Sequence, residues 1–185
     1  MDRVQAAFRA SPRAWFLPVS QRWRASYDGP LPLPAGQTNS QPRTVEAMLR
    51  LLDVQPGQRV LDVGAGSGWT TALLAHLTGP TGEVVGVELE PELVTLGTRH
   101  LAATGRRWAS IRQAEPGVLG APALAPYDRI LVSADATHLP RQLCDQLADG
   151  GRMVLPVGGV MHLVERAGEE FAVSRHGTYR FVPLR

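Results

Sequence analysis

The sequence predicts an α/β fold with a doubly wound, mainly parallel sheet and an antiparallel hairpin near the carboxyl end. Short apolar runs alternate with segments of helical periodicity along most of the chain. One run, Val60 to Val63, leads into glycines at alternate positions, as a buried parallel strand does when it turns directly into a helix. Near the end, Val160 to Arg166 and Phe171 to Arg175 flank a short polar turn, which is typical of a hairpin.

Before the first strand we expect an N-terminal helical cap and a proline-rich extended segment over residues 29–36. Ser40 is expected to cap the next helix, which has Pro42 in its first turn. One face of that helix carries apolar residues at helical spacing, namely Val45, Met48, Leu49 and Leu52. Gly57 then precedes the first strand.

The remaining elements alternate between helix and strand. A helix from Trp69 to Leu77 stops before Gly79-Pro80 and leads to a strand over residues 82–88. The later elements are a helix from about Glu92 to Ala103, strands over Ala109 to Arg112 and Tyr127 to Ser133, a helix over Arg141 to Leu147 and a strand over Gly151 to Val157. Ligands of such sheets bind at the carboxyl ends of the strands.

The glycine run distinguishes between two kinds of nucleotide-like cofactor site. Dinucleotide sites use G-x-G-x-x-G, whose backbone amides hold a pyrophosphate, whereas this chain reads G-x-G-x-G with Asp62 two residues before it. The shorter pattern resembles the first motif of class I methyltransferases, which use S-adenosyl-L-methionine. In that role Asp62 would anchor the loop or reach the methionine ammonium. The methionine and ribose portions would lie against Gly64, Ala65, Gly66, Ser67 and Gly68.

A second acid supports the same cofactor. Glu88 ends the second strand twenty positions after Gly68, where a carboxylate can accept hydrogen bonds from both ribose hydroxyls, and Leu89 is assigned to the same site. The alternative is that the glycines form only a tight strand-to-helix turn and that Glu88 is a solvated strand end. We favour the cofactor site because the acids and glycines occur together in the expected order.

Composition restricts the other possibilities. The chain has 185 residues, 44% of them hydrophobic, and no apolar run near the ~20 residues of a membrane span, so we expect a cytoplasmic protein with no membrane partner. Its cationic side chains are all arginines and are scattered, which does not indicate a nucleic-acid groove. Cys144 is expected in the core, and the five histidines lack metal-ligand spacing, so no metal site is predicted.

Segments outside the glycine motif resemble the protein-L-isoaspartate O-methyltransferase family over nearly the whole chain. They are Asp28 to Pro32, Gly36 to Pro42, Ala125 to Ile130, Gly150 to Gly158 and Phe181 to Leu184. The resemblance implies a class I, Rossmann-like methyltransferase that uses S-adenosyl-L-methionine to esterify the free α-carboxylate of isoaspartyl residues in damaged proteins. Its partner would be an isoaspartyl protein or peptide, and we expect a monomer.

The resemblance also assigns the acceptor side. The segment from Gln37 to Pro42 would lie over the methyl-transfer site, with Ser40 matching the serine usually described as catalytic and Thr38 shaping the pocket. An α-carboxylate has a pKa of about 3.3 to 3.7 and is already ionised at neutral pH, so no general base is required. Ser40 would therefore orient the carboxylate by hydrogen bonding, and the same serine could serve as the helix cap.

Three positions depart from the family pattern. Glu115-Pro116-Gly117 stands where the family has Gly-Asp-Gly, so the acid that contacts the adenine amine is missing, and we hypothesise that Glu115 and Gly117 contact the adenine instead. Asp135 adds a carboxylate near the acceptor; it would repel an isoaspartyl carboxylate if it points inward, and we favour an outward orientation. Asn39 replaces isoleucine and is expected to make the pocket edge more polar.

We expect one methyltransferase domain over residues 1–185. Its parts are a helical cap and substrate-loop segment over 1–56, a cofactor-binding core over 57–158, and a C-terminal hairpin and final strand over 159–185. Two other functions remain open at this point. One is a methyltransferase of the same fold with a different carboxylate or small-molecule acceptor, and the other is a non-catalytic binding protein that has kept the scaffold.

Overall fold

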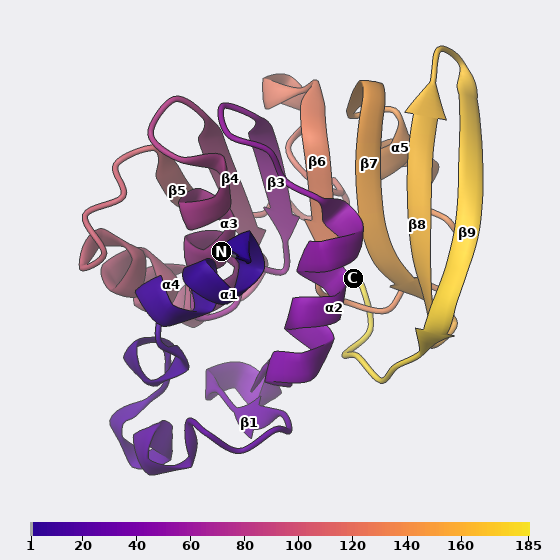
Figure 1. Ribbon diagram of the computed structural model, residues 1–185. Coiled ribbons are helices and arrows are strands. Elements are labelled where there is room, and N and C mark those ends of the chain that lie inside the picture. The colour runs from indigo at the N-terminus through magenta and orange to yellow at the C-terminus, as the bar shows by residue number, and fades with distance from the viewer. Residues whose placement is uncertain (1) are drawn as a thin grey trace.

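The computed structural model describes residues 2–185 and is built around one large sheet (Figure 1). Its strands are β3 (Arg59–Val63), β4 (Glu83–Glu88), β5 (Ala109–Gln113), β6 (Tyr127–Val132), β7 (Leu147–Val157), β8 (Val160–Ala167) and β9 (Glu170–Thr178). The order across the sheet is β5-β4-β3-β6-β7-β8-β9. Pairing is parallel from β5 to β7 and antiparallel for β7 with β8 and β8 with β9, which confirms the predicted fold class.

The other elements cover this sheet or lie at its edge. The helices are α1 (Arg3–Ala10), α2 (Pro42–Leu52), α3 (Trp69–Thr78), α4 (Pro91–Ala102) and α5 (Arg141–Cys144). Short 3-10 turns are η1 (Arg13–Phe16), η2 (Val19–Arg24), η3 (Pro34–Gly36) and η4 (Pro122–Leu124), and a small two-stranded sheet joins β1 (Leu31–Pro32) to β2 (Thr38–Asn39). Within residues 2–185, none of the helices has the length and apolar character needed to span a membrane.

Two hydrophobic cores form because successive side chains on a strand point to opposite faces of the sheet. Val60 packs with the apolar faces of α1, α2 and α3, whereas its neighbour Leu61 packs with Leu143 and Cys144 of α5. All four side chains are buried, and the expectation that Cys144 lies in the core is confirmed. The same alternation continues across the central strands, so each face of the sheet has its own apolar layer.

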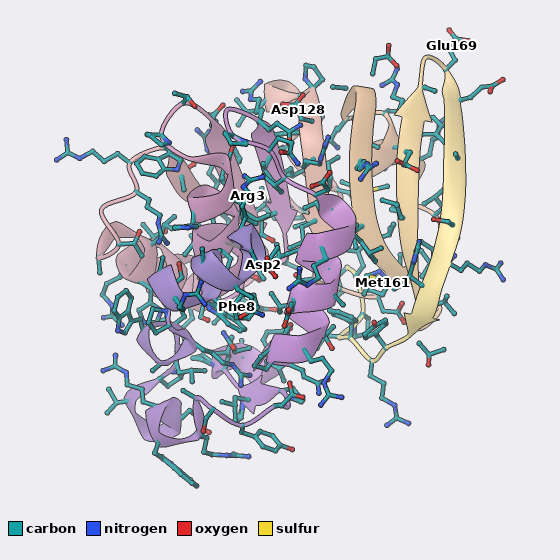
Figure 2. The ribbon with its side chains drawn as sticks, in the orientation of Figure 1. Asp2, Arg3, Phe8, Asp128, Met161 and Glu169 are labelled. Atoms are coloured by element: carbon teal, nitrogen blue, oxygen red, sulfur yellow. The ribbon has the colours of Figure 1, made fainter. Side chains whose placement is uncertain are left out.

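The segment of residues 13–40 lies beside the carboxyl ends of the parallel strands (Figure 1). At the opposite end of the strands lie the first residues of β6 and the tip of the β8–β9 hairpin, marked by Asp128 and Glu169 (Figure 2). This arrangement places the end of β3, the end of β4 and the residues before α2 next to one another, which is where the sequence predicts the site.

Three predicted details are wrong. The N-cap of α2 is Gln41 rather than Ser40, because Pro42 is the first helical residue and the first helical hydrogen bond joins Val45 N to Gln41 O. The helix expected to reach Leu147 ends at Cys144, since Leu147 pairs with Tyr127 and starts β7. In place of a final strand, the tail forms a single parallel bridge between Asp135 and Pro183.

Candidate functional site

A cavity opens at the carboxyl ends of β3 and β4. About 890 Å³ of empty space lies within it when the open mouth is included. Besides Ser133, Ala134 and several single residues, five stretches of chain supply the walls. They are the segment 37–40, the glycine loop 64–67, the end of β4 at 87–89, residues between 114 and 120, and the tail 182–185.

The three glycines of the loop are required for different reasons. All have positive φ, at 80° for Gly64, 55° for Gly66 and 88° for Gly68, a region that other residues rarely adopt. A Cβ on Gly66 would meet nothing closer than 3.8 Å, so this glycine leaves bare backbone facing the cavity. A Cβ on Gly68 would lie 2.9 Å from the carbonyl oxygen of Gly97, because this residue starts α3 against α4 and lies behind the cavity wall.

Glu88 lines the cavity and fixes the glycine loop by a hydrogen bond. Its Oε2 accepts a hydrogen bond from Gly66 N at 2.8 Å, and its Oε1 accepts from Leu89 N and Glu90 N at 2.8 and 3.0 Å. The side chain is 7% exposed. A carboxylate has about four acceptor positions, so these bonds leave about one for a ligand hydroxyl. Acceptance from both ribose hydroxyls therefore stays a prediction.

Asp62 lies under the loop and is fully buried, outside the cavity lining. Its Oδ2 accepts hydrogen bonds from the hydroxyls of Thr70 and Thr71, both at 2.7 Å, which ties β3 to the first turn of α3. Its Oδ1 finds no partner among residues 2–185. Burial raises the pKa of Asp62 to about 6, with the charge of Glu88 adding to the rise and the two threonine hydroxyls opposing it. Of the two predicted roles, this geometry favours loop anchoring.

Thr38 and Ser40 lie where the cavity meets a second, more open groove. Both residues line both hollows, together with Ser133 and Val182. The far side of the second groove is formed by the β7–β8 turn and by residues 178–182 of the tail. The two side chains expected to serve the acceptor are therefore on the wall that separates a small-molecule cavity from an open surface.

Asn39 lies between them but is 4% exposed, because alternate residues of an extended segment point in opposite directions. Asn39 lines the cavity, but both ends of its amide form hydrogen bonds within the protein, so the expectation that it makes the pocket edge more polar stays a prediction. Asn39 Oδ1 accepts from Arg13 Nε at 2.6 Å, and its Nδ2 donates to Ser67 Oγ at 3.2 Å.

Arg13 is a site residue that sequence reasoning missed. Besides Asn39 Oδ1, its guanidinium donates to the carbonyl oxygens of Tyr27, Gly29, Asn39 and Ser40 at 2.7 to 2.9 Å. It forms no ion pair with any of the described residues. Burial lowers the pKa of Arg13 to about 10, which leaves it charged at neutral pH. No local pattern marks it, because its partners are 14 to 27 residues away in sequence.

At the end of the cavity away from the glycine loop, the lining residues are not the ones that the sequence predicts. Ala114, Val118 and Leu119 line it, whereas Glu115 and Gly117 are exposed and lie outside the lining. The hypothesis that Glu115 and Gly117 contact an adenine therefore gains no support from this loop conformation, because a tight turn with Gly117 at φ 77° directs the residues between Ala114 and Val118 to solvent.

Asp135 has the outward orientation. Its Oδ1 accepts from Gly159 N at 3.0 Å, and its backbone pairs with Val182 and Leu184 of the tail. The carboxylate is used to hold the β7–β8 turn and does not line either hollow. It therefore does not oppose an anionic acceptor in the way that an inward carboxylate would.

The cavity fits S-adenosyl-L-methionine better than a phosphate-bearing cofactor. The amides of Gly64, Ala65 and Gly66 donate to Val87 O and Glu88 Oε2, so they are not free to hold a pyrophosphate. Within the described chain, the one cation lining the cavity is Arg185, which is paired with Glu90. The apolar far end suits an uncharged aromatic base. No cluster of metal-ligating side chains occurs in residues 2–185.

Comparison with known proteins gives the same assignment. The model of the family described as Protein-L-isoaspartate(D-aspartate) O-methyltransferase (PCMT) matches residues 1–185. A relative from Aeropyrum pernix named Protein-L-isoaspartate O-methyltransferase is 49% identical over 187 residues, which cover 98% of this chain and 72% of the relative. A relative of the same name from Methanopyrus kandleri is 44% identical, with 99% of this chain and 83% of the relative covered.

A solved structure agrees with these matches. The crystal structure of a putative protein-L-isoaspartate O-methyltransferase from Plasmodium falciparum, in complex with S-adenosyl-L-homocysteine, superimposes with a TM-score of 0.89 at 25% identity, covering 100% of this chain and 91% of that one. The glycine loop, the acid at the end of β4 and the segment over residues 37–42 therefore occur in a chain whose whole length matches one family. This chain belongs to the protein-L-isoaspartate(D-aspartate) O-methyltransferase family.

Proposed function

We propose that this protein transfers a methyl group from S-adenosyl-L-methionine to the free α-carboxylate of L-isoaspartyl residues in proteins or peptides. One observation carries the proposal: the cofactor cavity and the open groove share a wall made of Thr38, Ser40, Ser133 and Val182. A donor in the cavity and an acceptor in the groove would therefore approach each other at these four residues. Family membership identifies the acceptor class.

Each part of the chain has a positioning task. The bare backbone at Gly64 and Gly66, the carboxylate of Glu88 and the apolar side chains of Leu89 and Leu119 would hold the cofactor, which supplies an electrophilic methyl group when bound. Ser40 would orient the acceptor carboxylate by donating a hydrogen bond from its hydroxyl. No side chain needs to remove a proton, because the acceptor is ionised at neutral pH.

The groove suits an acceptor that is part of a polypeptide. It is an open surface whose far side runs along residues 178–182 and along Gly158 and Gly159, which would leave room for the chain on either side of a modified residue. Arg43 and Arg180 line it; because Arg43 is paired with Asp28, the positive charge that would attract an anionic peptide is that of Arg180. We further propose that the protein acts as a monomer in the cytoplasm, without a nucleic-acid partner.

The structure gives no support to a different acceptor. Asn39 and Asp135, the two departures that motivated that alternative, both bond within the protein and do not alter the groove surface. A loss of cofactor binding through Pro116 is likewise not favoured, because Pro116 lies in the exposed turn outside the cavity.

The test is methylation with labelled S-adenosyl-L-methionine and two peptides that differ only in carrying isoaspartate or aspartate. We expect label in the isoaspartyl peptide alone, and a fall of roughly tenfold or more in kcat for Ser40→Ala, since orientation of the reacting groups carries much of the rate. Equal labelling of both peptides, or labelling of neither, would overturn the proposal. Thermal stabilisation by S-adenosyl-L-homocysteine measures cofactor binding separately, and saturation at 100 times Kd corresponds to about 2.7 kcal/mol.

A further inference from the structure

The side chain of Asn39 joins two segments that the proposed reaction must align. Its Oδ1 accepts from Arg13 Nε at 2.6 Å and its Nδ2 donates to Ser67 Oγ at 3.2 Å. Ser67 belongs to the glycine loop and lines the cofactor cavity, whereas Asn39 lies between Thr38 and Ser40. One planar amide therefore connects the cofactor loop to the acceptor segment.

Arg13 makes this connection rigid on the acceptor side. The same guanidinium that holds Asn39 Oδ1 also donates to the backbone carbonyls of Asn39 and Ser40, both at 2.9 Å. It therefore fixes the peptide planes before and after Ser40 as well as the Asn39 side chain. The guanidinium also lies over the ring of Trp69, the first residue of α3, with 5.5 Å between the guanidinium carbon and the ring centroid.

Burial makes the arrangement sensitive to displacement. Arg13, Asn39 and Ser67 are 6%, 4% and 2% exposed, so a polar group that loses its partner here cannot readily bond to water instead. Ser67 is also held through its carbonyl, which lies 3.1 Å from His100 Nδ1. A movement of the loop at Ser67 must shift the Asn39 amide or break a buried hydrogen bond.

We infer that Asn39 is a positioning residue that couples the cofactor loop to the acceptor segment, through a chain of contacts from Ser67 to Asn39 to Arg13 to the Ser40 carbonyl. Ordering of the loop by a bound cofactor is transmitted by this chain to Thr38 and Ser40. The kinetic consequence rests on the proposed methyl transfer, but the coupling itself needs only cofactor binding. Asn39 acts through other residues and has no direct part in the chemistry.

The experiment compares hydrogen exchange with and without S-adenosyl-L-homocysteine in the wild type, Asn39→Ala and Ser67→Ala. In the wild type we expect the ligand to slow exchange both in the loop 64–68 and in the segment 37–41. In both variants the ligand should still protect the loop, whereas its protection of the segment should be lost. Unchanged protection of the segment in Asn39→Ala would overturn the inference.

Two further variants separate coupling from stability. Asn39→Asp keeps an acceptor for Arg13 and can accept from the Ser67 hydroxyl, so it should retain the ligand-induced protection of the segment. Thr78→Val removes another buried hydroxyl, which donates to Gln58 O at the far end of α3. It should lower Tm and leave protection of the segment unchanged. If Asn39→Ala does not fold, Ser67→Ala carries the same test.

Kinetics on the isoaspartyl peptide supplies an independent reading. Asn39→Ala and Ser67→Ala should each lower kcat by about tenfold, with KM for the donor changing by less than about threefold, since small misplacements of the reacting groups act mainly on rate. The double variant should lose no more than either single variant, as expected for two residues of one contact. Additive losses would contradict the coupling. Absence of wild-type turnover would count against the proposed function alone, because the exchange experiment does not require it.

Discussion

The glycine-loop end of the cofactor cavity is held by hydrogen bonds between specific groups, whereas its far end is walled by apolar side chains. At the first end, Glu88 accepts from three backbone amides and Asp62 accepts from two threonines. At the second, Ala114, Val118 and Leu119 provide surface, and Glu115 is exposed. Hydrogen bonds demand particular residues at fixed spacing, while apolar contact requires only area, so the two ends should respond very differently to substitution.

The largest contrast should come from glycine-to-alanine changes at the two ends. Gly68→Ala places a Cβ 2.9 Å from Gly97 O at φ 88°, and we expect it to lower the free energy of unfolding by about 3 kcal/mol and to abolish cofactor binding. Gly117→Ala has a similar φ of 77° but open space around it, so about 1 kcal/mol is expected. Urea unfolding of both variants measures the two losses in free energy of unfolding. Equal losses would show that the two ends of the cavity do not differ in their tolerance of substitution.

The buried carboxylate of the glycine-loop end should make stability depend on pH. Because the pKa of Asp62 rises from 3.8 to about 6 on folding, the folded state binds this proton more tightly than the unfolded state does. Stability should therefore fall as pH rises from about 4 to about 6, by up to about 3 kcal/mol. Asp62→Asn should flatten this part of the profile, measured by urea unfolding at several pH values. An unchanged profile would mean that Asp62 does not titrate in this range.

Glu88→Gln should weaken binding of S-adenosyl-L-homocysteine by about 2 kcal/mol, or about thirtyfold, since an amide NH₂ would then face backbone donors. The matched control is Glu92→Gln, which removes the same charge from an exposed position in the first turn of α4. Calorimetry on both variants gives the result. Similar affinities would show that the carboxylate contributes only its charge.

The smallest effect is expected at the far end. Glu115→Ala should change the dissociation constant by less than about twofold, because an exposed side chain outside the cavity makes no contact that the substitution can remove. Calorimetry again provides the measurement. A loss of about 1 to 3 kcal/mol in binding free energy is what removal of a direct contact costs. Such a loss would mean that the loop closes over the bound cofactor and that both ends of the cavity hold it by specific polar contacts.

The sequence predicted best what depends on local chemistry. Gly64, Gly66, Gly68 and Glu88 form a pattern because a strand-to-helix turn and a strand end restrict which residues fit. The strands β3 to β6 and the helices α3 and α4 could be located from periodicity for the same reason. These predictions required no knowledge of distant contacts.

The errors lie where distant residues decide. Ser40 does not cap α2, since the helix begins one residue later than the serine pattern suggested. Leu147 begins a strand because Tyr127, twenty residues earlier, pairs with it. Asn39 appeared to be a surface departure, but Arg13 and Ser67 draw its side chain inward. For Leu147 and Asn39 a partner remote in sequence determines the conformation, and no local pattern contains that information.

The wall shared by the cavity and the groove also has a pharmacological consequence. Because Thr38, Ser40, Ser133 and Val182 face both hollows, a single compound that joins a nucleoside-like group to a peptide carboxylate can occupy the two together. Linking two weak ligands makes the second binding step intramolecular, so the joined compound gains affinity without any new contact. A bisubstrate inhibitor of this design would engage the residues that line both hollows.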